Sequence, residues 1–165
     1  MRYVSKSPKE TNSIASDLLN TLVPKNDATV LALQGDLGAG KTAFAQEVGK
    51  ILGVRENMHS PTFVIEKIYQ IDFKHFKRLI HIDAYRLEKP ARPDARLNDT
   101  VGQDSGHSGG ESELLHLGWE EIIKEPENLI LIEWPENVTG IIPVDAKRIY
   151  FKFIDETTRE IEYES

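Results

Sequence analysis

The stretch Gly35-Asp36-Leu37-Gly38-Ala39-Gly40-Lys41-Thr42 matches the GxxxxGK[ST] pattern of a phosphate-binding loop. Its glycines allow successive backbone N–H groups to converge on one anionic ligand, because glycine adopts turn conformations that side chains disfavour. Lys41 supplies positive charge beside the β- and γ-phosphates, and the Thr42 hydroxyl supplies a ligand for Mg²⁺. Both residues begin a helix, whose N-terminal dipole favours phosphate, so the stretch predicts a nucleotide site.

The sequence on either side of the loop predicts a strand before it and a helix after it. Residues 29–33 form a short apolar run, typical of a strand buried on both faces. After the loop, Phe44, Val48 and Leu52 recur at helical spacing, and Gly53 suits the end of the helix. Because a phosphate-binding loop needs this order, we interpret the chain as a P-loop NTPase of the α/β class.

Length and composition narrow the class of protein. The chain has 165 residues, enough for one domain (1–165) with a substantial core. A net charge of -7 argues against direct nucleic-acid binding, so we expect any nucleic acid to be met through a partner. There is no cysteine, the N-terminus lacks an apolar signal core, and no apolar run reaches membrane-spanning length. We therefore expect a cytoplasmic protein that does not enter a membrane.

The other elements follow from hydrophobic periodicity and predict a mixed parallel and antiparallel sheet flanked by helices. A capping box at Ser7 and Glu10, with Pro8 in the first turn, predicts a helix that stops before Pro24. Further patterns predict strands at 63–71, 79–83, 128–133, 148–154 and 159–164, and a helical stretch at 113–123 that Gly118 interrupts. Residues 63–71 and 79–83 could pair as an antiparallel hairpin, and the last two strands form another.

Residues 89–112 differ from the rest of the chain. They contain four glycines, two prolines and almost no apolar side chains, so they cannot bury enough surface to order themselves. We predict a flexible insert at 89–112.

Two carboxylates are candidates for Mg²⁺ binding and for orienting the attacking water. Asp83 and Glu133 each end an apolar strand, where ligands of α/β sheets gather. Each could instead cap the turn that follows its strand, and the sequence does not divide their roles.

Two further residues are candidates for the site. Thr62, in a loop after the helix, could be a switch-like residue that contacts the γ-phosphate or Mg²⁺. It could instead be part of a Ser-Pro-Thr turn. His81 shares a face with Asp83 and could orient it.

The chain resembles the small bacterial ATPases of tRNA N6-threonylcarbamoyladenosine (t6A) biosynthesis, the TsaE family. The resemblance rests on four ordered motifs, which are the phosphate-binding loop, Ser60-Pro61-Thr62-Phe63, His81-Ile82-Asp83-Ala84-Tyr85-Arg86-Leu87 and Leu131-Ile132-Glu133-Trp134-Pro135-Glu136. It implies an ATPase that depends on Mg²⁺, is required for t6A37 in tRNAs reading ANN codons, and is slow without its partners. Those partners are protein subunits of the threonylcarbamoyl-transferase complex, and the chain alone is expected to be a monomer or to self-associate weakly.

The resemblance also assigns roles to residues. Lys41, Asp83 and Glu133 are the expected catalytic residues, and Thr42, Asp83 and Glu133 the expected metal ligands. The expected nucleotide contacts are Thr11, Gly35, Gly38, Ala39, Gly40, Lys41, Thr42, Ala43, Ser60, Thr62, Trp134 and Arg159. The chain departs from the family in Ala84, where leucine is usual, and in the length of residues 89–112, an insert that either contacts a partner or is inert.

Two other functions remain open. In a small-molecule or nucleotide kinase, the 89–112 insert with Arg92 and Arg96 would close as a lid over the acceptor. In a nucleotide-sensing module, the bound ATP would control association without productive turnover. Phosphate release and acceptor phosphorylation distinguish these functions.

Overall fold

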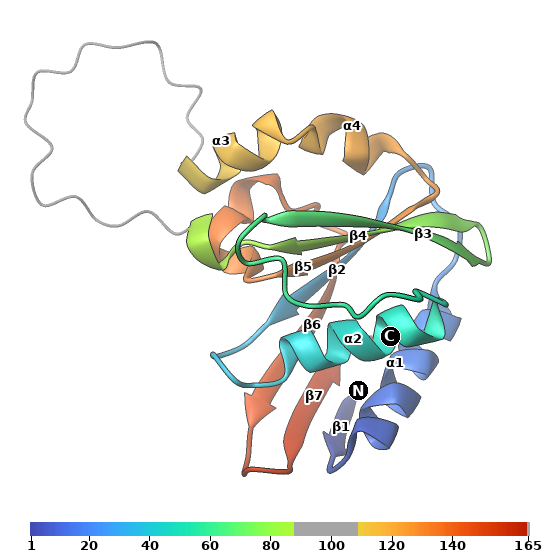
Figure 1. The fold of residues 1–165 in the computed structure, drawn as a ribbon, viewed down its shortest axis with the longest axis vertical. Coiled ribbons are helices and arrows are strands. Elements are labelled where there is room, and N and C mark those ends of the chain that lie inside the picture. The colour runs from blue at the N-terminus through green and yellow to red at the C-terminus, as the bar shows by residue number, and fades with distance from the viewer. Residues whose placement is uncertain (88–108, 165) are drawn as a thin grey trace, which may run out of the picture.

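The computed structural model describes residues 1–87 and 109–164, which form a single α/β domain with helices on both faces of one sheet (Figure 1). The strands are β1 (Arg2–Ser5), β2 (Thr29–Gln34), β3 (Glu66–Phe73), β4 (Phe76–Asp83), β5 (Asn128–Glu133), β6 (Lys147–Phe153) and β7 (Arg159–Tyr163). The helices are α1 (Pro8–Thr21), α2 (Lys41–Ile51), α3 (Gly109–His116) and α4 (Trp119–Lys124), with 3-10 helices η1 (Tyr85–Leu87) and η2 (Pro135–Ile141). Among these helices none is long and apolar enough to cross a membrane.

The described strands form one mixed sheet in the order β1-β7-β6-β2-β5-β4-β3. Strand β2 pairs in parallel with β5 and β6, and β5 pairs in parallel with β4. The outer pairs β3–β4, β6–β7 and β1–β7 are antiparallel. The predicted α/β class, the mixed sheet and both hairpins are thus confirmed. Because Asp83 and Glu133 are register partners, the two carboxylates end neighbouring strands.

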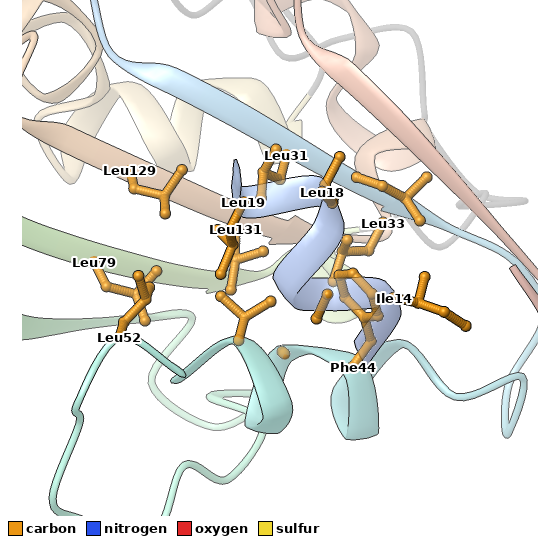
Figure 2. Close-up of a cluster of buried hydrophobic side chains, with 14 of the residues drawn as sticks. Ile14, Leu18, Leu19, Leu31, Leu33, Phe44, Leu52, Leu79, Leu129 and Leu131 are labelled. Atoms are coloured by element: carbon orange, nitrogen blue, oxygen red, sulfur yellow. The ribbon is translucent and has the colours of Figure 1, made fainter. Parts of the chain in front are cut away.

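Alternating side chains of the central strands build two cores. Leucines of β2, β4 and β5 point toward α1 and α2, where they pack around Phe44 (Figure 2). The intervening isoleucines, valine and alanine of the same strands pack on the opposite face against Leu114 of α3 and Trp119 of α4. A strand buried on both faces needs apolar residues at consecutive positions, which explains the continuous apolar runs in β2 and β5. The face toward α1 and α2 also carries Asp83 and Glu133, because each lies an even number of residues after a leucine of that face.

Helix α1 begins as its sequence predicts. The Ser7 hydroxyl accepts a hydrogen bond from the Glu10 backbone N–H at 3.3 Å, and Pro8 occupies the first turn. The Glu10 carboxylate accepts in turn from the Lys6 backbone N–H at 2.6 Å. These contacts satisfy N–H groups that have no partner within the helix.

The predicted strand at 63–71 was wrong at its start, because β3 begins at Glu66. The backbone N–H groups of Val64 and Ile65 both donate to the Pro61 carbonyl, which closes a turn. Ile65 has a φ of 66°, outside the extended region that a strand requires. The aromatic and β-branched residues at 63–65 therefore belong to a turn.

The predicted helical stretch at 113–123 is confirmed together with its interruption, because Gly118, with a φ of 88°, separates α3 from α4. Helix α3 starts at Gly109, so the last four residues of the predicted 89–112 insert are helical, and residues 88–108 lie outside the described part of the chain. A Cβ at Gly110 would lie 2.6 Å from the Leu87 carbonyl oxygen. Gly110, one of the glycines on which the prediction of a flexible insert rested, instead allows the backbones of α3 and η1 to approach closely.

Strand β1 was not predicted, since four residues carry too weak a pattern. It extends the sheet by pairing with β7. Tyr3 of β1 stacks on Tyr163 of β7, with ring centroids 5.3 Å apart. Strand β1 is therefore held in the sheet by contacts between the two ends of the chain.

Candidate functional site

Residues 35–42 connect β2 to the first turn of α2, the strand–loop–helix order that the motif requires. Gly35 has a φ of 145°, and a Cβ at this position would lie 2.3 Å from the carbonyl oxygen of Phe151 in β6. Gly40 has a φ of 107° and immediately precedes α2. The loop keeps its path because a side chain is excluded at its start and disfavoured at its end.

The Lys41 side chain folds back onto this loop. Its Nζ donates to the carbonyl oxygens of Gly35 at 2.5 Å and Asp36 at 2.9 Å, and lies 3.8 Å from the centre of the Trp134 ring. Burial lowers the pKa of Lys41, and the negative charges of Glu133 and Glu136 partly oppose that shift. The ammonium is therefore held by neutral carbonyl oxygens at the start of the phosphate-binding loop.

Glu133 has a partner on each carboxylate oxygen. The Thr42 hydroxyl donates to its Oε2 at 2.8 Å, and Nε2 of His81 lies 2.8 Å from its Oε1. The side chains of His81 and Glu133 are 1% and 2% exposed. This chain of contacts joins β4, β5 and the start of α2.

Asp83 has different partners. Its Oδ2 accepts from the hydroxyls of Ser60 and Thr62, the latter at 2.6 Å, and its Oδ1 accepts from the Tyr85 backbone N–H at 3.0 Å. The two hydroxyls also lie 2.8 Å from each other. Within the described residues no hydrogen bond joins His81 to Asp83, so the prediction that His81 could orient Asp83 was wrong.

These side chains surround a pocket of about 460 Å³. It brings together most of the predicted site residues, which are Gly38, Gly40, Lys41, Thr42, Ala43, Ser60, Thr62, Asp83, Glu133, Trp134 and Arg159. Gly35 and Ala39 do not line it, since Gly35 lies at the base of the loop and Ala39 is fully buried in the core. Leu37 and Tyr85 line it without having been predicted as site residues, although Leu37 lies in the phosphate-binding motif and Tyr85 in the motif at 81–87.

A second pocket of about 450 Å³ adjoins the first and shares Gly40, Ala43 and Arg159 with it. Thr11 lines this second pocket from the first turns of α1. Its hydroxyl lies 2.7 Å from that of Ser5 and 3.3 Å from the Ser7 carbonyl oxygen. The N-terminal helix therefore lies beside the phosphate-binding loop.

Trp134 follows Glu133 with a φ of 60°, in the left-handed region. Its ring lies 5.1 Å from that of Tyr85, and its backbone N–H donates to the Leu33 carbonyl at 3.3 Å. This turn places the Trp134 ring beside Lys41.

The donor set suits a hard cation. The hydroxyl of Thr42 and the carboxylates of Glu133 and Asp83 offer oxygen ligands, as Mg²⁺ prefers. In the described ranges no three His, Cys, Asp or Glu side chains gather as a metal-binding group. Mg²⁺ in nucleotide sites uses one or two carboxylates together with phosphates and water, so the residues present fit that ion.

Comparison with known proteins gives a consistent result. Residues 5–161 match the family model described as threonylcarbamoyl adenosine biosynthesis protein TsaE. The tRNA threonylcarbamoyladenosine biosynthesis protein TsaE of Rickettsia typhi is 33% identical over 158 residues, covering 95% of this chain and 90% of the relative. The protein of the same name from Bacillus subtilis is 29% identical, covering 99% and 84%. A crystal structure of Bacillus subtilis YdiB has a TM-score of 0.66 at 26% identity, covering 99% and 83%.

Proposed function

The chain belongs to the TsaE family, and from that premise we propose that it is a Mg²⁺-dependent ATPase serving t6A formation in tRNA. The observation that carries the ATPase proposal is the 2.8 Å hydrogen bond between Thr42 and Glu133. It joins the last residue of the phosphate-binding motif to a carboxylate at the end of a neighbouring strand. A P-loop NTPase uses such a pair to hold Mg²⁺.

The phosphates bind in the loop at 35–42. The backbone N–H groups at the start of α2 face the β- and γ-phosphates, where the helix dipole favours negative charge. Lys41 exchanges the carbonyls of Gly35 and Asp36 for phosphate oxygens, which are charged and therefore stronger acceptors. The rest of the nucleotide extends toward Thr11 and Arg159 in the adjoining pocket.

Hydrolysis then depends on positioning and charge. Glu133 and Thr42 would hold Mg²⁺, which when bound would supply positive charge beside the phosphate oxygens. Asp83 would orient the attacking water toward the γ-phosphorus. Ser60 and Thr62 position Asp83 through their hydroxyls. Cleavage between the β- and γ-phosphates yields ADP and phosphate.

The biological role requires partners. We propose that the chain acts in the cytoplasm with protein subunits of the threonylcarbamoyl-transferase complex, which themselves hold the tRNA. Its formal net charge of -7 favours contact with proteins over direct contact with a phosphate backbone. Alone it is a monomer or self-associates weakly.

Reconstitution of t6A formation on tRNA tests this role. The reaction is run without the chain, with the wild type, with Lys41→Ala, and with Lys124→Ala as a control on an exposed lysine of α4. We expect the wild type and Lys124→Ala to support modification, and Lys41→Ala to abolish it together with phosphate release. Equal modification with and without the chain would refute the role. ADP formation that needs an acceptor and releases no phosphate would favour the kinase.

A further inference from the structure

His81 occupies a position where packing alone favours an apolar side chain. It lies on β4 one step along the same face from Leu79, and Leu131 is its register partner on β5. All three residues are 0% exposed. A polar ring at such a site pays a desolvation cost that leucine avoids.

Among the described residues the ring makes one hydrogen bond. Its Nε2 lies 2.8 Å from Oε1 of Glu133, whereas its Nδ1 is buried without a partner among the described residues. An ionised carboxylate only accepts, so Nε2 carries the hydrogen, and in the neutral ring Nδ1 is then the bare acceptor. What the ring offers beyond an apolar side chain is therefore the hydrogen bond to Glu133.

That bond restricts the rotation of the Glu133 carboxylate. The last torsion of a glutamate is broad, so the carboxylate turns easily when only one oxygen is held. Thr42 donates to Oε2, and His81 donates to Oε1 from a neighbouring strand. With both oxygens held, Oε2 stays directed at Thr42 and into the pocket.

We propose that His81 is a positioning residue, whose Nε2–H fixes the Glu133 carboxylate so that Oε2 faces the divalent cation shared with Thr42. The inference rests on the proposed function, because the cation belongs to that function. A histidine suits the task since it donates from Nε2 without carrying a fixed positive charge. A lysine or arginine at this position would compete with the cation for the same carboxylate.

Three variants separate positioning from folding. His81→Leu removes the donor, His81→Gln keeps an N–H at a similar reach, and Leu79→Val perturbs the same face of β4 without removing a donor. The nucleotide affinity of each is measured by calorimetry with and without Mg²⁺, alongside phosphate release across a Mg²⁺ titration.

We expect His81→Leu to raise the half-saturating Mg²⁺ concentration and to lower turnover, each about 10–100-fold, as loss of a group that orients a metal ligand does. Nucleotide affinity without Mg²⁺ should stay unchanged. His81→Gln should recover most of the loss, and Leu79→Val should keep the Mg²⁺ response of the wild type. Adding His81→Leu to Glu133→Gln should have no further effect on turnover, because the carboxylate on which His81 acts is already gone.

A ligand-free measurement supports or overturns the contact itself. ¹⁵N NMR of the imidazole rings should show His81 as the Nε2–H tautomer, and that signal should shift in Glu133→Gln. An Nδ1–H tautomer, or a His81→Leu variant with the Mg²⁺ response of Leu79→Val, would overturn the inference. If the nucleotide affinity of the wild type did not change with Mg²⁺, the proposed function would be overturned instead. This outcome distinguishes failure of the proposed function from failure of the inference about His81.

Discussion

The ends of β4 and β5 carry two carboxylates that are equally buried and differently held. Asp83 is 3% exposed and Glu133 2%. The side-chain partners of Glu133, His81 and Thr42, belong to a central strand and a helix, whereas those of Asp83, Ser60 and Thr62, belong to a loop. Burial alone therefore does not distinguish the two carboxylates, and the elements that hold them do.

The loop that holds Asp83, residues 60–65, exposes two of its apolar side chains. Phe63 is 83% exposed and Val64 64%, directly after the hydroxyl of Thr62 that holds the carboxylate. Arg86 lies 4.3 Å from the Phe63 ring centre. Ile65, a β-branched residue at φ 66°, ends the loop in a conformation that L residues rarely adopt. We infer that the Glu133 side of the pocket is fixed and that the Asp83 side can rearrange.

Replacing Glu133 with Gln should reduce turnover more than any other substitution considered, if the Glu133 side of the pocket is the fixed one. The amide keeps the size of the side chain but loses the charge that holds the cation, so we expect phosphate release to fall about 10³-fold. Calorimetry should show nucleotide binding without Mg²⁺ close to that of the wild type, and little gain when Mg²⁺ is added. Normal turnover in this variant would make Glu133 a structural residue.

Replacing Asp83 with Asn should give a smaller loss of a different kind. Orientation of the attacking water is impaired, so turnover should fall about 10²-fold while the half-saturating Mg²⁺ concentration stays near that of the wild type. Asp72→Asn, at an exposed carboxylate of β3, serves as the matched control. If Asp83→Asn instead abolished the Mg²⁺ response and Glu133→Gln preserved it, the two assigned roles would have to be exchanged.

The sequence predicted this pair of strand ends but not their partners. A complete loop motif and continuous apolar runs give local signals for the phosphate-binding loop and for β2 and β5. The partner of His81 depends on the register between two parallel strands, which no local pattern encodes. Period-two alternation put His81 on the face of Asp83, yet the ring reaches Glu133 on the neighbouring strand. Likewise β1 joins the sheet by pairing with β7, at the other end of the chain.

Thr62→Val should produce a third, weaker effect. Valine keeps the shape of threonine but removes one of the two hydroxyls on Oδ2 of Asp83, so we expect turnover to fall about 10-fold, with Ser60 still in place. Amide hydrogen exchange around Phe63 should speed up, since the loop loses a contact with β4. Thr62→Ser keeps the hydroxyl and should behave as the wild type. Equal exchange in all three proteins would show that the hydroxyl does not hold the loop.

The smallest expected effect is on the pKa of Lys41, which depends on the negative charge of each carboxylate. Burial lowers the pKa of Lys41, and Glu133 counters that shift more strongly than Asp83 does. Glu133→Gln should therefore lower this pKa further than Asp83→Asn, as followed by the pH titration of the Lys41 side-chain NMR signal, assigned with Lys41→Arg. A lowered pKa means that the charged form is disfavoured in the folded chain.

The resulting loss of folding free energy is complete below the lowered pKa and disappears as the pH rises to the ordinary lysine value, so stability should increase across that interval. The increase should begin at a lower pH in Glu133→Gln than in Asp83→Asn, and a shared onset would mean that Lys41 senses the two carboxylates equally.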